Sequence, residues 1–375
     1  MTATVQAPRA VAVRFYHPEL DALRFFAFLA VYICHAIPAA SARVALIADI
    51  KDAGNFGVCL FFLLSAYLIT ELLRRELKEF GTIAIRAFYL RRILRIWPLY
   101  FGVIVSYAMG GIFFHALRME TGRMIAYFLL AGNWYIALHP WIQTPLRALW
   151  SISVEEQFYL VWPLLGKFGG MRAFMLAAIV LTPFSLMTVF IVAGAPYAWN
   201  TVWLNSFAQF LFFACGTLLA LALRGQLPGL RMWVRAALAI MGLLAWWVSA
   251  SAIQIKRPGA HVAPVQFCIG YVLVACGCIC LFLSVLGIEE HFVPPWMAYL
   301  GKISFGLYVF HETAFLLVDE VQKHALRRDA AWLLVLNKIV ALGATVFLAW
   351  VSYRFYESPF LRLKQHYARV PSRSV

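Results

Sequence analysis

An apolar segment near the start of the chain carries two residue types that can do chemistry. Arg24 is followed, after ten intervening residues, by His35. Eleven helical positions make slightly more than three turns, so the two side chains share one helix face, about 16 Å apart along the axis. A histidine titrates near neutral pH and can act as a general base, and an arginine binds anions. The spacing therefore indicates a candidate functional pair.

Both residues also have ordinary explanations. Arg24 could extend toward the inner membrane surface and pair with Asp21. His35 lies roughly 22 Å from the inner end of the helix, where no such escape exists, but it could be a packing histidine bonded to a neighbour. Ionisable groups are costly inside a bilayer unless they face a polar cavity, which favours a functional interpretation of both.

A polar stripe begins one residue after Trp150. Its polar members are Ser151, Ser153, Glu155, Glu156 and Tyr159. Positions i, i+4 and i+8 share a helix face, and about 1.5 Å per residue places Glu155 near the depth of His35. We therefore expect Glu155 or Glu156 to orient His35, with the stripe fixing its tautomer or binding sugar hydroxyls. Capping of the helix start by exposed carboxylates is the alternative explanation.

A basic and aromatic stretch occupies the predicted inner loop 86–95. Its cations are Arg91, Arg92 and Arg95, and aromatic side chains flank them. Guanidinium groups and rings could bind a phosphorylated nucleotide there. Attraction to anionic lipid would account for the same residues.

Three further polar residues interrupt apolar stretches. His311 follows Ser304 by two turns, about 21 Å above the inner start of its predicted span, so it either lines the same outer cavity or bonds a neighbouring helix. Asn133 breaks the stretch 124–138, which is too short to cross and is predicted to be re-entrant or interfacial.

Composition supplies the environment for these residues. Of the 375 residues, 63% are hydrophobic and only 13% are charged, which predicts an all-α, polytopic transmembrane helix bundle. The net charge of +15 falls mostly in short loops, as membrane topology requires, so we predict a lipid bilayer and no nucleic acid as partner. The seven cysteines lie in apolar segments, and we expect neither a disulfide framework nor a bound metal.

Ten apolar windows are long enough to cross a membrane. They are 20–38, 57–73, 97–115, 150–165, 171–193, 201–223, 234–253, 264–286, 297–318 and 331–353. If both termini are cytoplasmic, the inner segments carry about twice as many basic residues as the outer segments. We therefore expect one domain over 1–375, with a cytoplasmic leader 1–19, a transmembrane bundle 20–353 and a cytoplasmic tail 354–375.

These residues together resemble the acyltransferase-3 family of bacterial membrane O-acyltransferases, whose first helix carries the same pattern of Arg, ten residues and His. The resemblance covers the blocks 54–58, 61–69, 88–98, 132–134, 150–163, 301–311 and 356–359. It departs at Ala66 and Tyr67, where such proteins usually carry Gly-Phe. Some members add a soluble SGNH domain, and this chain is similar to the membrane-only form.

The resemblance implies acyl transfer, often of acetyl from acetyl-CoA, to a hydroxyl of a carbohydrate or glycolipid acceptor at the bacterial inner (cytoplasmic) membrane. The hypothesis is that His35 removes the acceptor proton. The CoA head group would bind the three arginines of 86–95, with Arg24 deeper along the path. Acyl-CoA is then a donor substrate, with no permanently bound cofactor, and direct transfer and an acyl-histidine intermediate both remain open.

Two other functions compete with this hypothesis. A multi-span transporter or exporter of a small metabolite also uses buried Arg, His and Glu, although no repeat relates the two halves of the chain. A non-catalytic partner of envelope assembly would keep the fold without needing His35. The acceptor, the acyl chain length and the oligomeric state are not predicted.

Overall fold

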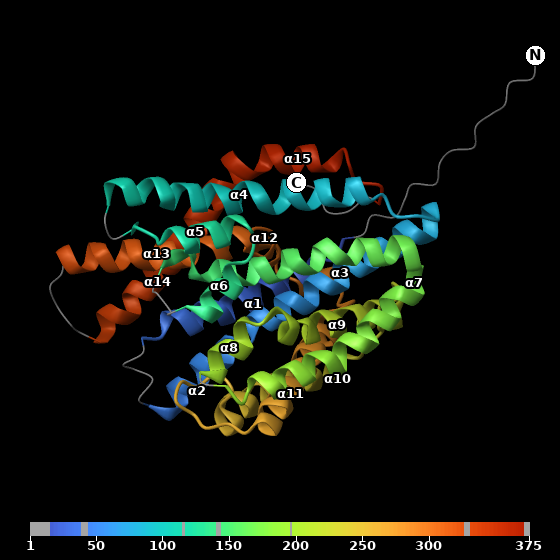
Figure 1. The fold of residues 1–375 in the computed structure, drawn as a ribbon, viewed down its shortest axis with the longest axis horizontal. Helices are drawn as coiled ribbons and strands as arrows, with labels where there is room; N and C mark the ends of the chain where they lie inside the picture. Colours follow the sequence, from blue (N-terminus) through green and yellow to red (C-terminus); the bar gives the residue numbers. More distant parts are fainter. Residues whose placement is uncertain are drawn as a thin grey trace, which may run out of the picture.

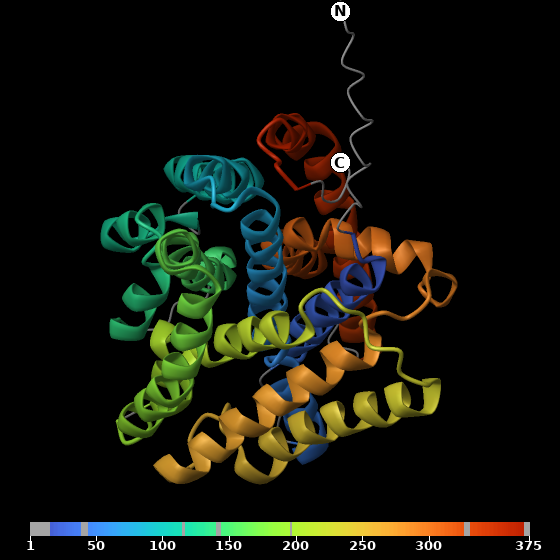
Figure 2. The ribbon, with the colours of Figure 1, turned by 90° about the vertical axis from the view of Figure 1, so that its right-hand side faces the viewer.

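The computed structural model describes residues 16–38, 44–114, 117–139, 144–195, 197–325 and 331–370, and within these ranges the regular secondary structure is entirely helical. The long helices pack side by side in one bundle (Figures 1 and 2). The α-helices are α1 (Pro18–Ala36), α2 (Ala45–Gly54), α3 (Gly57–Phe80), α4 (Ile85–Phe113), α5 (Thr121–Phe128), α6 (Gly132–Leu138), α7 (Trp150–Val192), α8 (Ala198–Leu204), α9 (Ser206–Leu223), α10 (Met232–Val248), α11 (Pro264–Val285), α12 (Pro295–Lys302), α13 (Ser304–Ala325), α14 (Ala331–Val351) and α15 (Ser358–Gln365). Short 3-10 segments are η3 (Pro145–Leu149) and η5 (Glu290–Phe292), and π segments are η4 (Ser249–Ile253) and η6 (Ser352–Glu357).

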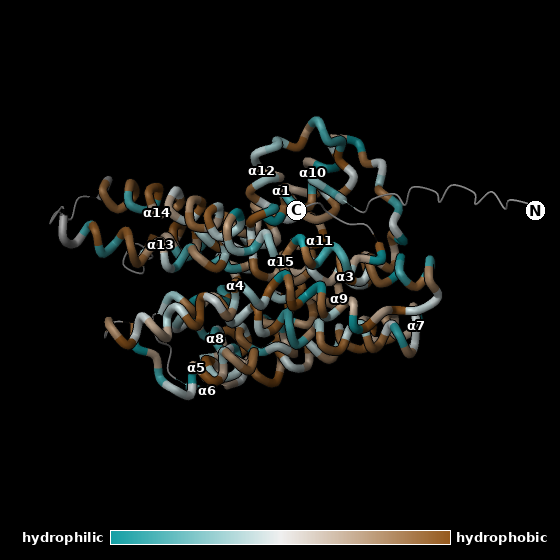
Figure 3. The backbone as a smooth tube through the Cα atoms, turned by 90° about the horizontal axis from the view of Figure 1, so that it is seen from above, coloured by the Kyte–Doolittle hydropathy of each residue, from teal (hydrophilic) through white to brown (hydrophobic). Residues whose placement is uncertain are grey.

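Seven helical segments of the described chain are long and apolar enough to cross a membrane. They are Ala45–Phe80, Ile85–Phe113, Pro145–Val192, Ser206–Leu223, Met232–Ile253, Pro264–Val285 and Leu333–Gln365. Hydrophobic residues run along most of their length (Figure 3). The helices α1 and α13 fall outside this set because several ionisable side chains interrupt them. The all-helical membrane class agrees with the prediction from the sequence.

The basic stretch predicted as an inner loop is helical. Helix α4 begins at Ile85, so Arg91, Arg92 and Arg95 lie on its first three turns. No glycine or proline stands between Ile85 and Pro98, and Pro98 itself is accommodated inside the helix. The expected loop 86–95 was therefore wrong, and the three cations are held on a rigid helix.

Helix breaks differ from the predicted spans at three more places. The window 201–223 is divided at Asn205 into α8 and α9. The window 297–318 is divided at Ile303 into α12 and α13. The window 124–138 is divided before α6, with Leu130 in the left-handed region at φ 55°, and not within Gly132 and Asn133 as the sequence indicated. None of these breaks coincides with a proline, so the sequence gave little indication of where they lie.

Helix α7 contains a reversal at Gly170. Its φ of 61° and ψ of −150° are non-helical and suit a residue without a side chain. The ring of Trp162 stacks on that of Phe174 at 5.3 Å, although a continuous helix would separate these positions by about 18 Å. The two windows predicted at 150–165 and 171–193 are thus the two arms of one helical hairpin.

The N-terminal end of α1 is held by backbone contact with α12. A Cβ added at Gly301 would lie 1.7 Å from the carbonyl oxygen of Asp21. Small residues permit this close approach between membrane helices, where packing replaces the hydrophobic effect as the source of stability. The contact fixes the turn of α1 that carries Asp21 and Arg24.

Replacing Gly301 tests this contact. Gly301→Ala should lower the thermal unfolding midpoint in nanodiscs by several degrees, because overpacking of about 1–3 kcal/mol shifts a midpoint by roughly 2–4 °C per kcal/mol. The matched control is Gly343→Ala in α14, where an added Cβ meets no atom within 4 Å. Equal midpoints for the two variants would contradict the close approach.

Candidate active site

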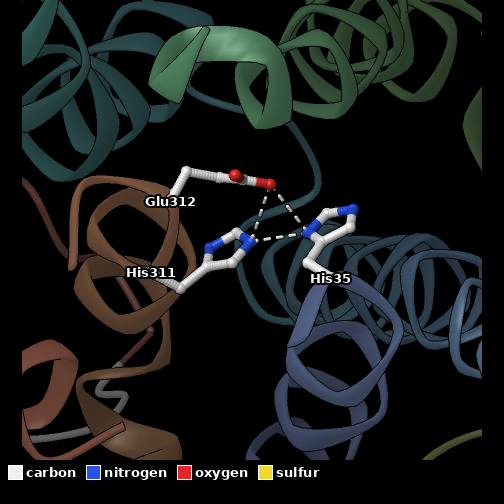
Figure 4. Close-up of side chains that lie close together, drawn as sticks. All are labelled: His35, His311 and Glu312. Carbon is white, nitrogen blue, oxygen red and sulfur yellow. Dashed lines mark hydrogen bonds and ion pairs between the residues drawn. The ribbon is translucent and has the colours of Figure 1, made fainter. Parts of the chain in front are cut away.

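Two histidines from helices far apart in sequence meet at one point of the bundle. His35 on α1 and His311 on α13 lie with Nδ1 of His35 2.8 Å from Nε2 of His311, and the two rings are nearly parallel at 3° (Figure 4). His311 is fully buried, whereas the His35 side chain keeps 24% of its surface exposed. His35 is therefore the member that a substrate can reach.

The hydrogen bonds fix where the protons lie. His311 Nδ1 is 2.7 Å from the carbonyl oxygen of Tyr308, which can only accept, so this nitrogen carries the hydrogen. In a neutral ring the opposite nitrogen, Nε2, then has a free lone pair and accepts from Nδ1–H of His35. The lone pair of His35 is consequently on Nε2, which points away from both partners (Figure 4). That is the tautomer a general base needs.

A buried carboxylate stabilises this pair. Glu312 Oε1 lies 3.0 Å from Nδ1 of His35 and 3.6 Å from Nε2 of His311. Arg147 on η3 binds the same carboxylate with two nitrogens, with Nε 2.8 Å from Oε1 and Nη2 3.0 Å from Oε2. A bidentate arginine keeps the carboxylate ionised and in one orientation, so it can stabilise a positive charge that develops on His35.

The expected contact between His35 and the carboxylates of α7 is not present. Glu155 accepts a hydrogen bond of 2.5 Å from Ser65, and Glu156 accepts one of 3.0 Å from the Trp97 indole. The predicted depth of Glu155 was counted from Trp150, on the assumption that Trp150 lies at the outer membrane surface. Instead the segment before α7 already lies level with the histidines, so Glu155 is one turn or more below them.

A cavity extends from the N-terminal ends of α1 and α4 and the C-terminal end of α3 toward the histidine pair. Its lining includes Arg24, Arg91, Arg92 and Arg95, the apolar side chains Val58, Phe61, Phe62, Leu68, Ile69 and Leu72, and the polar side chains Ser65, Ser151, Glu155, Tyr159, Ser304 and Tyr308. The i, i+4, i+8 spacing of the stripe on α7 thus brings its three main members into one wall. The cavity is cationic at one end, apolar in the middle and hydroxyl-rich at the other.

The four arginines differ in their partners. Arg91 donates to the Tyr367 carbonyl at 2.8 Å and lies 3.4 Å from Glu76, and Arg24 lies 3.4 Å from Asp21. Within the described part of the chain, neither Arg92 nor Arg95 has an ion pair, and the Nε of Arg92 is buried without a hydrogen-bond partner. Unpaired cations beside a cavity favour an anionic ligand.

Ser153 and Asn133 are packing residues in this structure. Asn133 is fully buried and joins three helices, donating to the Leu204 carbonyl and Ser206 and accepting from Gln157. Ser153 is fully buried and does not line the cavity.

The loop after η4 folds back into the protein. The Nζ of Lys256 lies 4.4 Å from the centre of the Trp203 ring, and burial lowers its pKa to about 8. Its neighbour Arg257 bridges Asp49 and Asp52 on α2 at 2.5 and 3.0 Å. This loop is thereby fastened to the short helix that follows α1.

His35 and its two neighbours His311 and Glu312 also carry the kinds of atoms that bind metal ions. The ligand-type atoms of His35, His311 and Glu312 lie within 4.8 Å of one another. Arg147 already holds both oxygens of the carboxylate, and a divalent cation there would be repelled by the guanidinium. The expectation of no bound metal stays a prediction.

Three residues of the site were missed from the sequence. Glu312 follows His311 directly in a predicted span, and a carboxylate in such a position is itself a sign of function. Arg147 lies between two predicted spans, where a basic residue gives no sign of function, and Tyr308 gave none either. Their association depends on three segments that only the folded chain brings together.

The pairing of Arg147 with Glu312 can be measured without any substrate. Arg147→Met should lower the unfolding midpoint strongly, because a buried carboxylate left without its partner costs about 3–5 kcal/mol. Adding Glu312→Gln to that variant removes the buried charge and should restore part of the midpoint. Purely additive losses in this double-mutant cycle would mean that the two side chains are not coupled.

Comparison with known proteins adds a family and relatives. Residues 17–354 match the model of an acyltransferase domain family, Acyl_transf_3. Similar curated proteins include the peptidoglycan O-acetyltransferase OatA of Listeria monocytogenes, 27% identical over 92% of this chain, and the putative peptidoglycan O-acetyltransferase YrhL of Bacillus subtilis, 28% identical over 92%. A putative O-acetyltransferase of Staphylococcus aureus is 24% identical over 92%.

The aligned region makes up 56%, 55% and 57% of these three relatives, so the chain spans little more than half of their length. No solved structure matches the chain.

Proposed function

We propose that this chain, which belongs to the acyltransferase-3 family, transfers an acyl group, most simply acetyl, from acyl-CoA to a carbohydrate hydroxyl. The observation that carries the proposal is the placement of a base-competent His35 beyond the end of a cavity lined by Arg92 and Arg95, which form no ion pair with another described residue. One end of this arrangement suits an anionic donor and the other suits a hydroxyl acceptor. The names of the relatives point to the same chemistry.

The donor would enter from the inner side. Phosphate groups of acyl-CoA would bind Arg92 and Arg95, with Arg91 and Arg24 adding charge beside them. The pantetheine arm would lie along the apolar wall formed by α3. This orientation directs the thioester toward the Ser151 and Tyr308 end of the cavity.

Transfer then requires one proton acceptor. His35 Nε2 would take the proton of the acceptor hydroxyl while the hydroxyl oxygen attacks the thioester carbonyl. The C–S bond then breaks, and the imidazolium returns this proton from Nε2 to the CoA sulfur, so that CoA leaves as the thiol. The resulting imidazolium would donate through Nδ1 to Glu312, which Arg147 keeps ionised. Attack by Nε2 itself, giving an acyl-histidine that the hydroxyl then cleaves, uses the same geometry.

The acceptor would be a carbohydrate or glycolipid of the bacterial cell envelope, modified at the inner membrane. Two relatives carry peptidoglycan in their names, which makes a peptidoglycan fragment the first acceptor to test. If α7 crosses twice around Gly170, and if α1 and α13 cross in addition to the seven apolar segments, the chain would cross the membrane ten times. Both termini would then lie on one side, which we propose is the cytoplasmic side.

The role of His35 can be tested by label transfer. Nanodisc-embedded protein is incubated with radiolabelled acetyl-CoA and an envelope glycan extract, and label is counted in glycan and on protein. His35→Ala should lose at least about 100-fold of the transfer rate, as loss of a general base does. The matched control is His291→Ala, an exposed histidine outside the cavity.

Equal incorporation by His35→Ala and wild type would remove the base role. Incorporation by neither, with several donors and acceptors, would favour a transporter or a scaffold. Label on the wild-type protein without acceptor would select the acyl-histidine route.

The arginine site predicts a donor-specific defect. Arg92→Gln and Arg95→Gln should raise KM for acetyl-CoA about tenfold or more, because each charge-assisted hydrogen bond contributes about 1.5–3 kcal/mol. The KM for acetyl-pantetheine, which lacks the phosphates, should stay within about twofold of wild type. Arg362→Gln, an exposed substitution on α15 that does not line the cavity, is the charge-matched control. An equal defect with both donors would contradict phosphate binding by these arginines.

A further inference from the structure

The cavity ends short of the histidine pair. Ser151 and Tyr308 belong to its lining, whereas His35, His311, Glu312 and Arg147 do not. The ring of Tyr308 lies 6.0 Å from that of Phe61 on the cavity side and 5.6 Å from that of His311 on the other side. Tyr308 therefore stands between the cavity and the site of the proposed chemistry.

Two polar contacts hold Tyr308 in this position. Its hydroxyl lies 2.8 Å from Oγ of Ser151 and donates to the carbonyl oxygen of Ala148 at 3.0 Å. Ala148 lies in η3 next to Arg147, and Ser151 is the second residue of α7. The side chain thus bridges α13 to α7, and it is only 7% exposed.

The backbone of the same residue serves the histidines. The Tyr308 carbonyl accepts from His311 Nδ1, and this bond sets the tautomer of the pair. A rotation of the Tyr308 side chain leaves that carbonyl in place, because side-chain and backbone torsions are separate. The passage can therefore open without dismantling the base.

We propose that Tyr308, latched by Ser151, is a gate that closes the donor cavity from His35. The inference deepens the proposed function, since it rests on the cavity being the donor site. With the gate closed, the thioester cannot reach His35, and no water-filled path joins the two sides of the membrane. With the tyrosine rotated away from Ser151, the acyl group passes its former position and meets the histidine.

The closed gate has a function that can be observed without any acyl transfer. A continuous polar passage through the bundle would conduct protons. Protein reconstituted in liposomes that enclose a pH-sensitive dye should be tight in the wild type after an external acid pulse. Tyr308→Ala should raise the rate of proton entry at least about tenfold, since it removes both the ring and its hydrogen bonds. Free CoA, by filling the cavity, should reverse much of that leak.

A graded series separates the gate from general loosening. Tyr308→Leu should leak less than Tyr308→Ala, and Tyr308→Phe, which keeps the ring, should lie nearest to wild type. Tyr271→Ala is the matched control, because it truncates a buried tyrosine of the same size outside the cavity and should stay tight. If Tyr308→Ala does not fold, the Leu and Phe variants still rank the effect.

The outcomes distinguish the gate from the proposed function. Folded Tyr308→Ala and Tyr308→Leu proteins as tight as wild type would overturn the gate, whatever the transferase assay gives. A leak from these variants, together with failure of wild type to use any acyl-CoA, would keep the gate and refute the donor assignment. If both ideas hold, Tyr308→Ala should also hydrolyse acetyl-CoA faster than wild type without an acceptor.

Discussion

The site depends on the ion pair between the carboxylate of Glu312 and Arg147. Inside a membrane bundle an ionised carboxylate persists only when it is paired, and Arg147 pairs it with a bidentate geometry. The same carboxylate contacts Nδ1 of His35. One side chain of α13 thereby fixes the segment before α7 and the C-terminal end of α1 relative to each other. A small movement of any of these three elements would reorient the histidine.

The rest of the bundle holds the cavity arginines and the histidine pair at different positions along the helix axes. Close contact of α1 with α12 at Gly301 fixes the turn of Arg24, and the continuous start of α4 fixes the neighbouring arginines. Apolar side chains of α3 separate these cations from the hydroxyl groups of Ser151 and Tyr308. The arrangement keeps the cavity arginines and the histidine pair at a fixed distance from each other.

Local sequence signals predicted the helical membrane class, the arginines that line the cavity and the candidate general base His35. Arg24 and His35 were recognisable because both lie in one helix, where spacing alone decides which side chains share a face. The partner of His35 was not recognisable, because Glu312 and Arg147 come from distant segments whose relative depth the sequence does not reveal. Depth counted from Trp150 selected Glu155 instead, since the segment before α7 enters the bundle further than a surface loop would. The break at Ile303 had no proline to mark it, and Gly301, two residues before it, lies inside α12.

The lining of the cavity would suit a single-chain anionic amphiphile, because it combines guanidinium groups with aliphatic and phenyl side chains. Molecules of that shape are abundant where this protein resides and in the reagents used to extract it. Free fatty acids and carboxylate or sulfate detergents match both regions of the cavity. Neutral maltoside or glyco-diosgenin extraction, followed by lipid exchange, is therefore the route that leaves the binding site empty for biochemical work.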